Sequence, residues 1–197
     1  MRLCFASNNA HKLEEIRPLL PAGTELLSLA DIGCQEELPE TQDTLEGNAR
    51  QKARYVWEHY GVPCFADDTG LEVTALHGAP GVYSARYAGP QRSAADNVQK
   101  LLHELRPHAD RSARFRTVVA LVLSETDEHL FAGEVLGQIS PEQRGSGGFG
   151  YDPVFVPAEG DGRSFAEMAL NEKNQLSHRA RAVGQLVAFL NRLPRLA

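Results

Sequence analysis

The sequence predicts an α/β protein with a mixed twisted sheet flanked by helices, arranged as two lobes with a central cleft. The first half of the chain alternates strand-like and helix-like segments, an order typical of α/β proteins. A long strand is then expected over 114–124, centred on the apolar and β-branched run 117–123, and residues 128–139 follow as its hairpin partner. The chain has 197 residues, which is enough for one large domain or two small lobes around a real core.

The first strand–helix unit lies at the N-terminus. Residues 2–6 are mostly apolar and predict a strand, and the polar residues 7–9 supply turn chemistry and a helix N-cap. Apolar side chains recur at helical spacing up to Leu20, and Pro18 is expected to end or kink this helix. Residues 24–29 predict a second short strand.

A capping box marks the start of the next helix, with Asp43 as N-cap and Glu46 three residues later. We expect this helix over residues 44–60. Two interpretations are open for its polar face: a lysine that reaches a phosphate, or side chains that are simply solvated. The solvated face is favoured when these residues are taken alone. The face consists of residues four apart, Thr44, Asn48 and Lys52.

Two adjacent acids, Asp67 and Asp68, form a predicted turn between strands at 62–66 and 71–75. Carboxylates at a strand end stand where α/β proteins often carry catalytic groups, and their oxygens suit Mg²⁺. Glu40 could add one more oxygen ligand. An ordinary polar turn is the alternative, and these residues alone weigh both interpretations about evenly. Neighbours in an extended chain point to opposite sides, so the two acids need not share a role.

The second half of the chain contains further helices and strands. A helix is expected over 93–105, a glycine-rich loop over 141–150, a strand over 151–156 and a final helix over 177–193. Residues 145–150 satisfy the GxGxxG pattern of dinucleotide-binding proteins, but that pattern should open a helix and here precedes a strand. The loop is better interpreted as one that presents aromatic side chains, either to a nucleotide base or to the core.

Composition restricts the function classes. The net charge of −6 disfavours non-specific binding to nucleic acid, which needs a basic surface. The sequence contains no apolar run long enough to span a membrane, and the apolar N-terminus is too short for a signal peptide, so a cytoplasmic location is expected. The three cysteines have no metal-like spacing and are expected to be reduced thiols in or near the core.

Two more polar segments could bind a ligand. Residues 7–12 lie between a strand and a helix, where backbone N–H groups attract anions, although a plain N-capped helix is favoured for this segment alone. Lys173, Ser177, His178 and Arg179 gather donors near the last helix. A solvated helix start is the alternative, yet His178 and Arg179 point in different directions and cannot both belong to one packed face.

Six blocks, in order along nearly the whole chain, resemble the inosine triphosphate pyrophosphatase family. Any one block is weak evidence, whereas six in the family's order are strong. They are Ser7-x-Asn9-x-x-Lys12, Glu40-Thr41-x-x-Thr44-x-x-x-Asn48-Ala49, Ala66-Asp67-Asp68-Thr69-Gly70-Leu71, the segment from Gly78 to Tyr87, the segment from Gly147 to Pro153, and Glu172-Lys173-x-x-x-Ser177-His178-Arg179.

The resemblance implies roles for the matching positions. Glu40 and Asp68 correspond to Mg²⁺ ligands, and Asp68 also corresponds to the proton acceptor for the attacking water. The remaining matches are substrate-binding positions. The phosphate loop matches Ser7, Asn8, Asn9, Ala10, His11 and Lys12, with Asn8 in place of a frequent Gly; Thr69 stands where Ser is common; and the base pocket matches Phe149, Gly150, Tyr151, Asp152, Lys173, His178 and Arg179.

The resemblance also implies an activity. A single domain over residues 1–197 would hydrolyse non-standard purine nucleoside triphosphates, namely ITP, dITP and XTP, to the monophosphate and pyrophosphate. It would use Mg²⁺, act as a homodimer in the cytoplasm, and bind neither nucleic acid nor membrane. A nucleotide-binding module without activity is the rival from another class, since it would not need Glu40 and Asp68. An NAD-dependent oxidoreductase is a weaker rival that only the glycine pattern suggests.

Overall fold

The computed structural model describes residues 1–193, which form two compact units. Of the described residues, unit 1 contains 1–68, 117–133 and 179–193, and unit 2 contains 69–116 and 134–178. A mixed sheet has the strand order β2-β1-β3-β5-β6-β7, with β4 paired to β3. Strands β3, β5 and β6 each contribute residues to both units. The predicted α/β class with a mixed sheet is confirmed.

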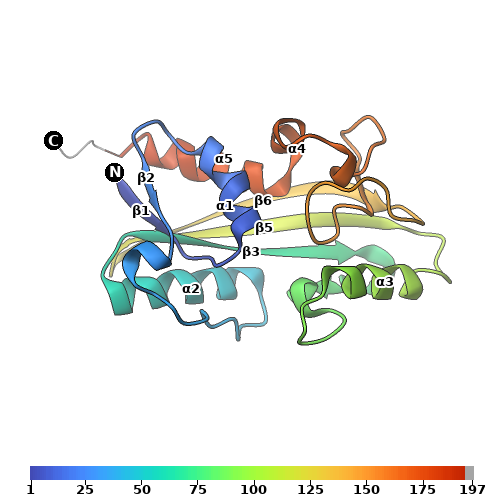
Figure 1. The fold of residues 1–197 in the computed structure, drawn as a ribbon, viewed down its shortest axis with the longest axis horizontal. Helices are drawn as coiled ribbons and strands as arrows, with labels where there is room; N and C mark the ends of the chain where they lie inside the picture. The colour runs from blue at the N-terminus through green and yellow to red at the C-terminus, as the bar shows by residue number, and fades with distance from the viewer. Residues whose placement is uncertain (194–197) are drawn as a thin grey trace. The chain divides into compact units, whose positions relative to one another are not determined.

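Unit 1 is built on parallel pairing of β1 with β2 and with the first part of β3. Helices α1 and α5 cover one face of this part of the sheet, and α2 covers the other (Figure 1). Its core includes buried Leu3, Phe5, Phe65 and Leu186. The elements are β1 (Arg2–Phe5), α1 (Ala10–Ile16), β2 (Glu25–Leu27), α2 (Leu45–Tyr60), β3 (Cys64–Val73), β5 (Ser112–Ser124), β6 (Asp127–Ile139) and α5 (His178–Leu190).

Proline and glycine end the first two helices of unit 1 as the sequence predicts. Helix α1 stops at Ile16 and passes into a short 3₁₀ turn, Arg17–Leu19, that contains Pro18. Helix α2 ends at Gly61, which adopts a left-handed conformation with φ of 63°. The predicted N-cap of α2 is wrong by one residue, because the Thr44 hydroxyl, rather than Asp43, accepts from the Gly47 amide at 3.0 Å.

The predicted turn at Asp67 and Asp68 is wrong. Strand β3 runs without interruption from Cys64 to Val73, so both acids lie inside a ten-residue strand. A strand tolerates two buried acids here because partners on opposite sides satisfy them. Gly70 further along the strand allows close backbone approach, since a Cβ there would lie 2.7 Å from the Gly81 carbonyl oxygen.

Unit 2 contains the remainder of β3, strands β4 (Pro80–Gly81) and β7 (Phe155–Pro157), helices α3 (Ala94–Glu104) and α4 (Leu170–Leu176), and parts of β5 and β6. Helix α3 lies on one face of this part of the sheet, and α4 with the loops before it lies on the other (Figure 1). Ser93 caps α3, and Val98 and Leu101 point into a core that includes Phe115, Phe155 and Phe165.

The strand predicted over residues 151–156 is wrong for most of its length. The chain turns over residues 150–154, and only Phe155–Pro157 pair as a strand, with β6. The Asp152 carboxylate accepts from the Phe149 amide at 2.7 Å, which favours a turn there. The predicted final helix over 177–193 is confirmed as α5, which spans His178–Leu190. Helix α4 was not predicted, and Ser177 between the two helices has an extended backbone.

The cysteines agree with the prediction of thiols in or near the core. Cys4, Cys34 and Cys64 are all free thiols and all buried. No helix within residues 1–193 is both long and apolar enough to cross a membrane.

Candidate active site

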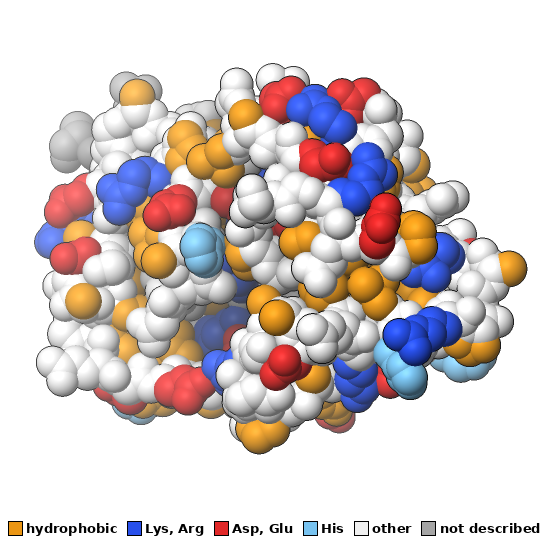
Figure 2. Space-filling model, turned by 45° about the vertical axis from the view of Figure 1, so that its right-hand side comes forward, with side chains coloured by type: hydrophobic (Ala, Val, Ile, Leu, Met, Phe, Trp, Pro, Cys, Tyr) orange, Lys and Arg blue, Asp and Glu red, His pale blue; other side chains and the backbone are white. Residues whose placement is uncertain are grey.

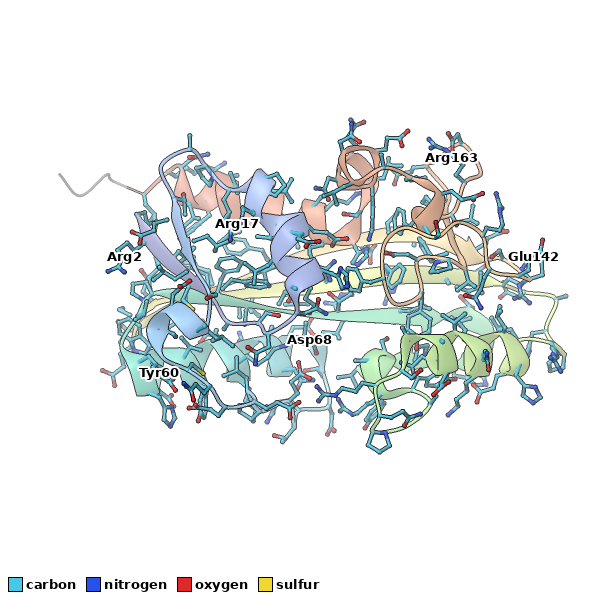
Figure 3. All side chains as sticks on the ribbon, in the orientation of Figure 1. Arg2, Arg17, Tyr60, Asp68, Glu142 and Arg163 are labelled. Carbon is cyan, nitrogen blue, oxygen red and sulfur yellow. The ribbon has the colours of Figure 1, made fainter. Side chains whose placement is uncertain are left out.

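Strand β3 sends its two acids to opposite faces of the sheet. Asp67 contacts residues of α1 and α5, whereas Asp68 contacts residues of α2. Asp68 is labelled in Figure 3, where it lies on the side of β3 that faces α2. Successive side chains of a strand alternate in direction, and this alternation separates the two carboxylates. Because the two acids face opposite sides of the sheet, they need not share a role. Each acid has its own set of charged partners.

Asp67 lies at the centre of a buried charge cluster in unit 1. Its side chain is fully buried and accepts from Lys12 Nζ at 2.8 Å and from Arg179 Nε at 3.2 Å. Arg179 also forms a close ion pair with Glu15 of α1. Burial by itself would raise the pKa of Asp67, but the nearby Lys12 and Arg179 cations outweigh burial and hold that pKa well below its usual range. Asp67 is therefore ionised at neutral pH.

The pKa values of Lys12 and Arg179 shift in opposite directions within this cluster. Burial lowers the pKa of Lys12, although the Asp67 carboxylate offsets part of that effect. For Arg179 burial also works against the charge, but the Asp67 and Glu15 carboxylates outweigh it and raise the pKa. The cluster thus holds two cations and two anions inside unit 1. Lys12 is the member with most access to solvent, its side chain being 14% exposed.

Asp68 belongs to a second cluster formed with α2 and the preceding loop. Asn48 Nδ2 donates to Asp68 Oδ2 at 3.0 Å, and Lys52 Nζ lies 4.0 Å from Asp68 Oδ1. Lys52 Nζ also donates to Glu40 Oε1 at 2.6 Å and to the Asp67 carbonyl oxygen at 2.7 Å. The favoured interpretation of a solvated helix face is wrong, because Asn48 and Lys52 are both buried. One lysine therefore brings Glu40 and Asp68 together.

The two acid neighbours have opposite pKa shifts. Burial raises the pKa of the Asp68 carboxyl, and the Lys52 and Lys12 cations only partly offset burial. For Lys52 burial opposes the charge, but the Asp68 and Glu40 carboxylates outweigh it and raise the pKa. A carboxylate with a raised pKa is a better proton acceptor than an ordinary aspartate. Asp68 is thus suited to act as a base, and Asp67 is suited to hold cations.

The segment before α1 is a polar turn. Asn9 caps α1 by accepting from the Lys12 amide at 3.3 Å, and the Asn9 amide donates to the Ser7 hydroxyl at 3.2 Å. Asn8, Ala10 and His11 are exposed. These contacts give the segment a defined shape, with Lys12 directed at Asp67.

Unit 2 contains a separate polar and aromatic cluster. Lys173 Nζ of α4 donates to Asp152 Oδ2 at 2.7 Å, and both side chains are buried. The same ammonium lies 5.1 Å from the centre of the Phe149 ring and 5.6 Å from that of Phe165, so aromatic faces surround it. Gly148 has φ of 68°, and a Cβ there would collide with the Asp152 carboxylate. The loop therefore needs glycine at this position.

Stacked rings hold His178 in unit 2. Its imidazole lies 4.5 Å from the Phe115 ring at an interplanar angle of 12°, and Phe165 is 6.3 Å away. Tyr151 is buried, and its hydroxyl donates to the Ser84 carbonyl at 2.9 Å. Gly150 and Thr69 are partly exposed.

Not every predicted site residue joins the expected group. Arg179 was grouped with Lys173 and His178, yet its guanidinium contacts Asp67 and Glu15 in unit 1. Sequence reasoning missed Glu15, which could have been noticed as an acid three residues after Lys12 beside the apolar Ile16 of the same helix.

The donor set of the Asp68 cluster fits Mg²⁺. Glu40 and Asp68 offer carboxylate oxygens, the ligands this ion prefers, and Mg²⁺ is usually held by one or two carboxylates together with substrate phosphates. Within residues 1–193 no group of three or more potential ligand side chains is found. A pair of carboxylates suits an ion that shares its coordination with the phosphates of a ligand.

The fold and these clusters define an α/β protein whose unit 1 concentrates lysines and carboxylates suited to a phosphorylated ligand. Acidic and basic side chains are interspersed on the face shown in Figure 2, so the net charge of −6 does not form a broad acidic surface there. Comparisons with known proteins make the assignment specific. The Ham1 family model matches residues 3–189, and the chain belongs to that family.

Relatives and solved structures agree with this membership. A dITP/XTP pyrophosphatase of Porphyromonas gingivalis is 58% identical over 191 residues, covering 96% of this chain and 97% of its own length. The structure of a HAM1 protein from Coxiella burnetii has a TM-score of 0.90 at 37% identity, covering 98% of this chain and 100% of its own. The Staphylococcus aureus Ham1 protein has a TM-score of 0.88 at 35% identity, covering 97% and 98%. The family resemblance seen in the sequence is thus confirmed.

Proposed function

We propose that this chain is a pyrophosphatase that hydrolyses non-standard purine nucleoside triphosphates, namely ITP, dITP and XTP, to the monophosphate and pyrophosphate. The observation that carries the proposal is the pairing of Glu40 and Asp68 around Lys52 in a chain 58% identical to a dITP/XTP pyrophosphatase. Such an activity removes these nucleotides from the nucleotide pool.

Asp68 is the proposed base. It takes a proton from a water that attacks the α-phosphorus, and pyrophosphate leaves. The raised pKa of Asp68, caused by burial, supports this role because a base works best when its pKa approaches the working pH. Asn48 orients the carboxylate through a 3.0 Å hydrogen bond.

Lys12 and Lys52 are the proposed counter-charges for the triphosphate, together with the backbone of residues 7–12. The two ammonium groups lie in unit 1, with Asp67 and Glu40 as present partners. Positioned charge of this kind stabilises the transition state of phosphoryl chemistry. Mg²⁺, held by Glu40 and Asp68, would supply further charge neutralisation on the phosphate oxygens.

The cluster of Phe149, Asp152, Lys173 and His178 in unit 2, with Gly150 and Tyr151, is the proposed base pocket. Lys173, buried beside Asp152, is the proposed donor to the O6 atom of hypoxanthine or xanthine. An adenine amino group would leave that donor unsatisfied, which is costly in a buried site. Thr69 would contact the substrate through its hydroxyl.

Arg179 is proposed to act differently from the role that the resemblance suggests. Its guanidinium contacts Glu15 and Asp67, an arrangement that supports a positioning role toward Lys12 more than direct reading of the base. The chain is further proposed to act as one domain over residues 1–197, as a homodimer in the cytoplasm, without nucleic-acid or membrane partners.

The decisive experiment measures pyrophosphate release from ITP, XTP, dITP, ATP and GTP, with Mg²⁺ and after chelation. We expect release from the non-standard purines only when Mg²⁺ is present. The Asp68→Asn variant should lose turnover by a factor on the order of 10² to 10⁴ and still bind nucleotide. Near wild-type turnover in this variant would reject the mechanism. Nucleotide binding without release in the wild type would favour the binding-module rival, and orthophosphate as product would mean that a different bond is cut.

A further inference from the structure

The loop that carries Glu40 is attached to α2 through side-chain contacts with its backbone. The Thr41 amide donates to Gln51 Oε1 at 2.9 Å, and Gln51 Nε2 donates back to the Thr41 hydroxyl at 2.9 Å. The Gln42 amide donates to Asn48 Oδ1 at 2.9 Å. Thr41 and Gln42 are exposed residues outside any helix or strand, so these bonds replace the backbone pairing that regular structure would supply.

Gly47 gives independent evidence that the loop and the helix are fitted to each other. It lies in the first turn of α2, where glycine is a poor helix former. A Cβ built there would lie 2.6 Å from the Gln42 Cβ, closer than two such atoms can approach. Glycine at this position therefore lets the loop lie directly against the start of the helix.

Asn48 connects this loop to the proposed base. Its side-chain oxygen accepts from the Gln42 amide, and its side-chain nitrogen donates to Asp68 Oδ2 at 3.0 Å. The side chain is 1% exposed, so both halves of the amide are used inside the protein. One buried residue thus contacts the loop two positions after Glu40 and also the carboxylate of Asp68.

Helical spacing places these contacts on one face of α2. Gln51 and Lys52 follow Asn48 by three and four residues, and this spacing places each of them beside Asn48 on the helix surface. Lys52 on that face contacts the Glu40 carboxylate itself. The helix therefore holds the loop at three neighbouring positions.

We propose that Asn48 and Gln51 are positioning residues, which fix the loop of Glu40 on α2 and couple the placement of Glu40 to that of Asp68. The effect on catalysis rests on the proposed function. The attachment of the loop to α2 does not, and it can be tested in protein that contains neither metal nor nucleotide.

Two variants separate the two halves of the proposal. Gln51→Ala removes both bonds to Thr41 and leaves Asn48 in place. Asn48→Asp keeps an oxygen for the Gln42 amide but replaces the donor to Asp68 with a second negative charge. Gln99→Ala, on the exposed side of α3, is the matched control. Gln51 is only partly buried, so its variant is expected to fold even if Asn48→Asp does not.

The first measurement is amide hydrogen exchange in metal-free protein. In Gln51→Ala, exchange at the Thr41 amide should accelerate on the order of tenfold, because two neutral hydrogen bonds are lost. In Asn48→Asp, exchange at the Gln42 amide should stay near the wild-type rate. Unchanged exchange at Thr41 in Gln51→Ala, or exchange in Gln99→Ala that rises equally, would overturn the holding of the loop.

The second measurement separates kcat from KM and from the Mg²⁺ requirement in pyrophosphate release. Gln51→Ala should raise the half-saturating Mg²⁺ concentration several-fold and recover most of kcat at saturating Mg²⁺. Asn48→Asp should lower kcat at every Mg²⁺ concentration. Equal losses of kcat in both variants would overturn the separate roles. If the wild type releases no pyrophosphate from any nucleotide, the proposed function fails, and the exchange result still decides whether the loop is held.

Discussion

The buried cluster around Asp67 predicts a large loss of stability on the change Asp67→Asn. The substitution keeps the shape and one acceptor oxygen but removes the negative charge that Lys12 and Arg179 share at 2.8 and 3.2 Å. The cluster would then hold two cations and one anion, Glu15. Removing one partner of a buried ion pair costs about 3–5 kcal/mol. Since the Lys12 side chain keeps 14% exposure and part of its hydration, we expect the lower end, about 3 kcal/mol.

Unfolding in urea, followed by fluorescence, is a suitable assay. Trp57 is the only tryptophan of the chain and lies on α2 of unit 1, the unit that contains the cluster. Glu25→Gln is the matched control, because Glu25 pairs with Arg2 at the surface of the same unit, where an ion pair is worth at most about 1 kcal/mol. A loss in Asp67→Asn no greater than that of the control would refute the reasoning.

The pH dependence has a definite sign. The pKa of Asp67 is lowered in the folded state, so its ionisation contributes stability at pH values above the unfolded pKa of about 3.9. That contribution declines as the pH falls below this value toward the still lower folded pKa. The difference between wild type and Asp67→Asn should therefore be constant from pH 7 to 5 and shrink in more acidic solution. A difference that grows on acidification would contradict the assignment.

A double substitution tests the charge balance. Asp67→Asn combined with Arg179→Met leaves Lys12 and Glu15, again one cation and one anion. We expect the double variant to be less destabilised than the sum of the single variants, by about 0.5–3 kcal/mol, the range typical of residues in contact. Strict additivity would mean that the two charges do not interact.

Three further outcomes follow from the sites. Because burial raises the pKa of Asp68 in the protein without metal, its carboxyl should titrate above the ordinary aspartate value of about 3.9 when followed by NMR without Mg²⁺; a pKa at or below that value would contradict the dominant effect of burial. Lys173→Met should reduce the ITP-over-ATP ratio of kcat/KM by roughly tenfold or more, and an unchanged ratio would exclude Lys173 from base selection. Gly148→Ala should lower the thermal midpoint, because φ is 68° and the methyl group would collide with Asp152, whereas Gly184→Ala, in open space on α5, should leave it unchanged or raise it.

Local patterns predicted the secondary structure where one strong signal acted alone. Pro18 ends α1 and Gly61 ends α2, because each residue restricts or permits a particular backbone conformation. The prediction failed at Asp67 and Asp68, where polar composition indicated a turn. Two acids are compatible with a buried strand only when cations from other segments meet them, and those partners are far away in the sequence.

In the candidate site too, local features could be predicted from the sequence, whereas contacts between distant residues could not. Lys12, Glu40 and Asp68 could be selected by residue type and by family resemblance, and the structure brings all three into unit 1. The partners of Arg179 could not be foreseen in this way. Its contact with Glu15 joins residues 164 positions apart, and no local spacing encodes such a pair. The burial of Lys52 was likewise hidden, since a polar helix face looks the same whether water or carboxylates satisfy it.

Because side chains alternate along β3, the face on which each acid lies depends on whether the number of strand residues before it is odd or even. Deleting one residue between Cys64 and Ala66 would move every later side chain of the strand to the opposite face. Asp68 would then meet the Lys12 and Arg179 cations, and Thr69 would face Lys52. An even number of inserted or deleted residues keeps the faces, whereas an odd number exchanges them. Active relatives should therefore conserve whether the count of residues leading to the acids is odd or even.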